Sequence, residues 1–140
     1  MTTTQPDTAP APNDLDRLLG ASVEAATRLL SADGEFYPFA VAMTAAGEVV
    51  SPAVDPPTDH PTADEVVALL LEALRGSRET LRACAVCSDV RIRSDAGEDR
   101  DAIRIELEAP GADPLVVVVP YADQKLEEPM GMAGERRVFA

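Results

Sequence analysis

The chain has 140 residues, 46% of them hydrophobic, with three Phe, two Tyr and no Trp. This composition predicts a folded domain with an aliphatic core and excludes a chain too polar to fold. The formal net charge is −13, from 25 acidic and 12 basic residues. That charge argues against nucleic acid and membrane partners, because phosphate backbones and anionic lipids bind basic proteins. A basic protein partner is favoured instead.

The first residues of the chain bear on where the folded domain begins and on the cellular compartment of the protein. Residues 1–12 are rich in Thr, Pro and Ala without periodicity, so we expect a disordered tail before a single domain at residues 13–140. The start carries neither region of a secretory signal, and no apolar run approaches the ~20 residues of a membrane span. We therefore expect a cytoplasmic protein.

The charge of the chain is unevenly distributed. Residues 1–74 hold 12 acidic and two basic residues, so negative charge gathers in the first half.

A helix is predicted from Asn13 or Asp14 to Gly34. Either polar residue can cap the first turn, and the glycine can end the helix. Between them, apolar residues recur at the spacing of one helical face. They are Leu15, Leu18, Leu19, Val23, Ala26, Leu29 and Leu30.

Residues 36–43, FYPFAVAM, predict the first strand and hold most of the aromatic side chains. In an extended strand Tyr37 and Phe39 would share one face, and Phe36 and Pro38 the other. Two interpretations stay open: the rings close the core against the first helix, or they anchor a protein partner. A turn at Gly47 and a short second strand, VVSPA, follow.

A proline-rich loop and a second helix come next. Four prolines make residues 51–61 a stiff loop. Thr62 and Glu65 have the spacing of a capping box, in which each side chain bonds the other residue's backbone N–H. The apolar residues that follow predict a helix that bends or ends near Gly76.

The second half of the chain predicts three strands. Apolar residues alternate along two predicted strands, Val86, Val90 and Ile92 in the first and Ile103, Ile105 and Leu107 in the second. The opposite face carries Arg91, Arg93, Arg104, Glu106 and Glu108, which predicts a hairpin with an apolar inner face and one charged, wet outer face. Residues 115–119 are all apolar and predict a buried strand that Pro120 ends. The remainder predicts mostly loop, with Val138 and Phe139 docking on the core.

Together these elements predict an α+β fold. We expect a two-layer domain with two helices, an antiparallel sheet of about five strands, and the element order α-β-β-α-β-β-β.

The sequence Cys84-Ala85-Val86-Cys87 has the spacing of redox and zinc motifs. In a strand, however, residues three apart point to opposite faces and lie ~10 Å apart, whereas a disulfide needs Cα atoms within about 7 Å. The motif also follows a helix rather than beginning one, and no second cysteine pair is present. We therefore expect two buried structural cysteines and no metal or other cofactor.

His60 is the only histidine and lies in the proline-rich loop among several carboxylates. Such a histidine could bind a metal ion or act as a base, so a small enzyme or metal-binding protein is one alternative. No phosphate-binding loop, nucleophile motif or second histidine accompanies it. A solvent-exposed acidic loop is the simpler interpretation, and no catalytic residue is assigned.

These observations favour a non-enzymatic protein-interaction module, such as an adaptor or an immunity-type inhibitor, whose acidic surface meets a basic partner. The expected contact residues are the carboxylates and histidine around the proline-rich loop, together with one aromatic residue of the first strand. They are Asp55, Asp59, His60, Asp64, Glu65 and Tyr37.

Three stretches resemble a group of small bacterial hypothetical proteins: GEFYPFAVAMTAAGEVV, DVRI…DAIRIELE and VVVVPYAD. The resemblance covers residues 14–140 and implies the same fold, without catalytic residues to carry over. The order of elements and the stretch VAMTAAGEVV are also similar to the roadblock type of profilin-like domain. That similarity implies a homodimer that binds a small GTPase.

Overall fold

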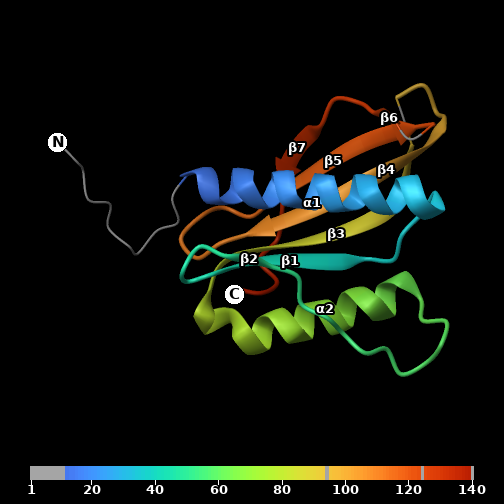
Figure 1. Cartoon of the computed structure of the whole chain (residues 1–140). Coiled ribbons are helices and arrows are strands. Elements are labelled where there is room, and N and C mark those ends of the chain that lie inside the picture. The colour runs from blue at the N-terminus through green and yellow to red at the C-terminus, as the bar shows by residue number, and fades with distance from the viewer. Residues whose placement is uncertain (1–11, 94, 124, 140) are drawn as a thin grey trace.

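The protein, described here by a computed structural model covering residues 12–93, 95–123 and 125–139, has an α+β fold built on one antiparallel sheet (Figure 1). The element order predicted from the first helix to the third strand of the second half is confirmed. The predicted tail at residues 1–12 lies outside the described residues, except that Pro12 begins the first helix. The elements are α1 (Pro12–Asp33), β1 (Phe39–Thr44), β2 (Val49–Val50), α2 (Ala63–Ser77), a 3-10 turn (Arg78–Thr80), β3 (Leu81–Arg93), β4 (Asp99–Glu108), β5 (Leu115–Ala122), β6 (Lys125–Leu126) and β7 (Met130–Ala133).

The sheet has more strands than the expected five. Its order is β2-β1-β3-β4-β5-β6, and β7 pairs with β5 on the same side as β6. Both extra strands form in residues 125–133, which the sequence predicted as loop. Pro120 does not end β5, because it pairs opposite Ala102 and its carbonyl accepts the N–H of Glu127. Proline removes one donor from a strand and leaves its acceptor available.

The two helices cover opposite faces of the sheet, so the domain has three layers and the predicted two-layer arrangement is wrong (Figure 1). α1 packs Leu18 and Leu30 against one face of β1, β3, β4 and β5. α2 packs Leu70 and Leu74 against the other face of β1 and β3. Strands covered on both sides are buried at successive residues, as β1 and the middle of β3 are.

The β3–β4 hairpin is confirmed, but its faces differ from the prediction. Ile103 and Ile105 face α1, whereas Val90 pairs with Ala102 on the other face of the sheet. The sequence had placed the apolar residues of both strands on one inner face. That assignment fails because each face of this sheet has its own apolar layer, so apolar and charged residues occur on both.

The two cysteines behave as predicted from strand geometry. Cys84 and Cys87 are free, buried, and packed on opposite faces of β3. Burial, and to a smaller extent the carboxylates of Glu108 and Asp89, raise the pKa of both thiols, which reaches about 12 for Cys84. Neither thiol is therefore ionised near neutral pH, which suits structural residues.

The start of α2 confirms the capping box. The Thr62 backbone N–H donates to Oε1 of Glu65 at 2.8 Å, and the Glu65 N–H donates to the Thr62 hydroxyl at 3.1 Å. The helix ends at Ser77, one residue after Gly76, as expected. Within the described part of the chain, neither helix is long and apolar enough to cross a membrane.

Candidate functional site

The end of α1, residues 34–38 and the start of α2 meet at one end of the sheet, on the right in Figure 1. They surround an open groove of about 730 Å³. Small-ligand and side-chain pockets are commonly of roughly 300–1,000 Å³, so this groove can hold one or two side chains of another molecule. Its lining residues are Leu29, Asp33, Glu35, Phe36, Tyr37, Pro38, Ala63 and Asp89.

The groove forms because α1 ends sharply at Gly34. This glycine has φ +76° and its N–H bonds the carbonyl of Leu30 at 2.8 Å, a helix end that favours glycine over residues with a Cβ. The chain then turns away from α1, and β1 begins only at Phe39. Residues 35–38 consequently form an irregular segment beside the groove, outside the ladder of the sheet.

The aromatic residues of this segment divide between core and surface. Phe36 and Phe39 contact each other, with ring centroids 5.5 Å apart, and both pack on the α1-side core. Tyr37 is 55% exposed. The predicted pairing of Tyr37 with Phe39 on one strand face is wrong, because residues 36–38 precede the strand. Of the three rings, Tyr37 is the one available to a partner.

Asp89 of β3 holds this segment in place. Its Oδ1 accepts a 2.6 Å hydrogen bond from the Tyr121 hydroxyl, and its Oδ2 accepts the backbone N–H of Phe36 at 3.4 Å. Tyr121 is buried on the α1 side of the sheet, and its burial and the Asp89 carboxylate raise the pKa of its hydroxyl. Both carboxylate oxygens are engaged, so Asp89 positions the groove wall that carries Tyr37.

A second hollow of about 400 Å³ lies beside the groove. The two share Asp33, Glu35 and Asp89, so these carboxylates line both. The second hollow also contains Asp101 and Arg91, which form an ion pair with an N–O distance of 3.9 Å. Four carboxylates and one guanidinium therefore line this region, and the field there is negative.

The structure brings the sequence-predicted contact residues together only in part. Tyr37 lines the groove with Ala63, directly before Asp64 in the first turn of α2. Glu65 bonds Thr62 in the helix cap, and the hydrogen bond from the Thr62 backbone lowers its pKa. The remaining three are exposed in the loop and are absent from the groove lining, namely Asp55, Asp59 and His60.

The carboxylates that do line the groove were missed by sequence reasoning. Asp33 and Glu35 flank the helix-ending glycine, where polar residues are common and carry little information. Asp89 offered a better signal. It follows Ala85 and Cys87 at every second position of β3, and both of these residues are buried against α1. A carboxylate in a core-facing register indicates a specific polar partner.

Chemically, the groove offers carboxylates and one exposed phenol ring. Within residues 12–93, 95–123 and 125–139, no three His, Cys, Asp or Glu side chains group so that they could hold a metal ion. Comparison with protein-family models, curated proteins and solved structures finds no match to this chain. The relation to the small bacterial group and to roadblock domains stays a prediction.

Proposed function

We propose that this protein is a non-enzymatic interaction module, an adaptor or an immunity-type inhibitor, that binds a basic segment of a protein partner in the groove. The observation that carries the proposal is that the exposed Tyr37 lines the same groove as Asp33 and Glu35. An aromatic face beside carboxylates attracts an arginine or lysine side chain by cation–π and charge-assisted contacts.

The way the groove is built supports a binding role. Asp89 ties the Phe36 backbone to β3, and Tyr121 holds Asp89 from two strands away. The segment carrying Tyr37 is therefore ordered before a partner arrives, which lowers the entropy lost on binding. The net charge of −13 adds long-range attraction for a basic partner and speeds encounter at low salt.

The proposal can be tested with a defined cationic probe. We suggest measuring fluorescence anisotropy of a fluorescein-labelled, arginine-rich peptide at low and high NaCl concentration. Replacing both rim carboxylates, Asp33→Asn with Glu35→Gln, is expected to weaken binding about tenfold, equivalent to about 1.4 kcal/mol. Binding to the unchanged protein should weaken as salt rises.

The matched control changes the same charges elsewhere on α1. Asp16→Asn with Glu24→Gln also removes two exposed carboxylates of α1, neither of which lines the groove. This control should weaken peptide binding less than about twofold, because screened surface charges contribute little at a distance. Equal losses in both double variants would show attraction to the whole surface and would contradict a groove site.

A further inference from the structure

Two carboxylates on the rim of the groove have no cation to pair with. The side chains of Asp33 and Glu35 form no ion pair or hydrogen bond with any residue that the structure describes. Asp33 is the last residue of α1, and the last turn of this helix holds no basic residue. The carbonyl end of a helix carries partial negative charge, so an acidic residue there is unfavourable unless a cation lies close by. The local structure therefore favours a positive charge in the groove.

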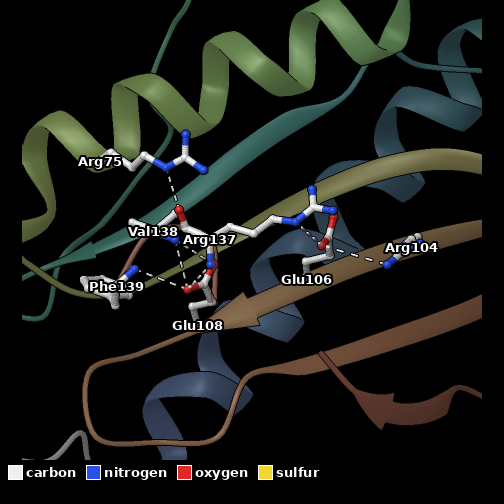
Figure 2. A network of polar contacts seen from close by, with 7 residues as sticks. All are labelled: Arg75, Arg104, Glu106, Glu108, Arg137, Val138 and Phe139. Atoms are coloured by element: carbon white, nitrogen blue, oxygen red, sulfur yellow. Dashed lines mark hydrogen bonds and ion pairs between the residues drawn. The ribbon is translucent and has the colours of Figure 1, made fainter. Parts of the chain in front are cut away.

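Arginines of the chain itself are engaged elsewhere. Figure 2 shows three of them on the α2 side of the sheet, where Glu108 accepts the backbone N–H groups of residues 137–139. They are Arg75, which donates to the carbonyl of Arg137, and Arg104 and Arg137, whose guanidinium groups lie 3.9 and 3.7 Å from Glu106. None of these arginines lines the groove, and Arg91 of the neighbouring hollow is paired with Asp101. The missing cation therefore has to come from another molecule.

The backbone on both sides of Tyr37 is restrained. The preceding residue, Phe36, donates its N–H to Asp89 at 3.4 Å and packs its ring on the α1-side core. The following residue is Pro38, and a residue before proline is restricted to extended conformations. The exposed ring of Tyr37 is therefore presented from an ordered segment, which lowers the entropy lost when a ligand stacks on it.

An arginine side chain fits this combination better than a lysine side chain does. A guanidinium is planar, so its face stacks on an aromatic ring while the N–H groups at its edge donate to carboxylates. An ammonium is a compact, strongly hydrated charge without a flat face. Leu29 and Pro38 add apolar surface for the methylene groups of the side chain. On the basis of the interaction function proposed above, we propose that Tyr37 makes the groove selective for arginine over lysine in the basic segment of the partner.

The test compares two fluorescein-labelled peptides that differ only in their cation. One is the arginine-rich peptide, and the other has lysine at every arginine position. Anisotropy titrations of the full-length protein should give a Kd about fivefold lower for the arginine peptide. In Tyr37→Ala this preference should fall below about twofold, because the guanidinium loses its stacking surface and the ammonium loses little. An unchanged preference in Tyr37→Ala would overturn the selectivity assigned to this ring.

A third peptide separates the charge of the guanidinium from its shape. Citrulline in place of every arginine keeps the planar group and removes the positive charge. This peptide should not bind measurably, because the unpaired carboxylates of the groove require a cation. Binding as tight as that of the arginine peptide would show that the groove does not recognise charge, and the proposed selectivity would be wrong.

The carboxylate variants distinguish failure of the selectivity from failure of the interaction function. Asp16→Asn with Glu24→Gln should keep the arginine preference, because neither residue lines the groove. Equal binding of the arginine and lysine peptides to the unchanged protein, with both weakened by Asp33→Asn and Glu35→Gln, would leave the interaction function standing and refute the selectivity. If neither peptide binds the unchanged protein, both proposals are wrong.

Discussion

The Tyr121 hydroxyl and the Asp89 carboxylate form a 2.6 Å hydrogen bond that spans β4. Asp89 pairs opposite Ile103 and Tyr121 opposite Asp101, so the two side chains reach each other over the intervening strand. The other oxygen of Asp89 bonds the Phe36 backbone. A residue of β5 thus determines, through β3, where the segment carrying Tyr37 lies.

Removing this hydroxyl should change how stability depends on pH. Tyr121→Phe is expected to lower the free energy of unfolding by about 1 kcal/mol, the usual worth of one hydrogen bond. The native pKa of Tyr121 lies above the unfolded value near 10, so its contribution is complete below pH ~10 and is lost as pH rises further. Urea unfolding at several alkaline pH values should show a shallower decline for Tyr121→Phe. The same slope in both proteins would argue against a protonated, bonded hydroxyl.

As pH rises, the buried thiols should begin to lower the free energy of unfolding at a lower pH than Tyr121 does. An unfolded cysteine ionises near pH ~8.5, whereas native Cys84 keeps its proton until about pH 12. Between these values the unfolded chain binds fewer protons, so stability falls as pH rises, by at most about 1.4 kcal/mol per pH unit for each thiol. Cys84→Ala and Cys87→Ala should each flatten this decline between pH ~8.5 and ~10. Urea titrations that show no flattening would contradict the burial of the thiols.

One ion pair between α1 and β3 should matter far more than an exposed pair on the same helix. Arg82 Nη2 lies 2.8 Å from Oδ2 of Asp14, which is 2% exposed. Arg82→Met should cost about 2 kcal/mol of stability, because it removes a charged hydrogen bond from a buried carboxylate. Arg28→Met, which breaks the largely exposed pair with Glu24, should cost less than about 0.5 kcal/mol. If thermal or urea unfolding showed equal losses of stability in Arg82→Met and Arg28→Met, burial of Asp14 would not determine how much its ion pair contributes.

Three glycines offer a test of local packing. A Cβ at Gly20 or Gly76 meets no atom within 4 Å, and both lie in helices, so Gly→Ala should stabilise by up to about 1 kcal/mol each. A Cβ at Gly134 would lie 3.2 Å from the backbone nitrogen of Leu115, which cannot move aside cheaply. Gly134→Ala should therefore lower the melting temperature while the helical variants raise it. A higher melting temperature in all three variants would mean that β5 can shift to accommodate a Cβ at residue 134.

Tyr37 should affect binding without affecting folding. Because the Tyr37 ring is largely exposed, Tyr37→Ala should leave the melting temperature nearly unchanged. It should weaken binding of the arginine-rich peptide about three- to tenfold. Tyr37→Phe keeps the ring face and should bind nearly as the unchanged protein does. Anisotropy titrations of the three proteins decide this, and a loss in Tyr37→Phe as large as in Tyr37→Ala would assign the effect to the hydroxyl.

Much of the fold follows from local rules that can be read from residues in order. The spacing of leucines marks α1, Thr62 and Glu65 mark the start of α2, and strand alternation separates Cys84 from Cys87. These signals depend on residues within one or two turns of each other. Residues 125–133 escaped prediction because β6 and β7 are short, and they form against β5 rather than by propensity.

The sequence by itself determined the α+β class, the order of the main elements, the helix cap and the placement of the two cysteines on opposite faces of a strand, since each depends on neighbouring residues. Only the tertiary structure decided that the helices take opposite faces, that Asp33 and Asp89 line one groove, and that Glu108 holds residues 137–139. These relationships join parts of the chain far apart in sequence. They arise when both faces of one sheet bury apolar surface, which no local pattern specifies.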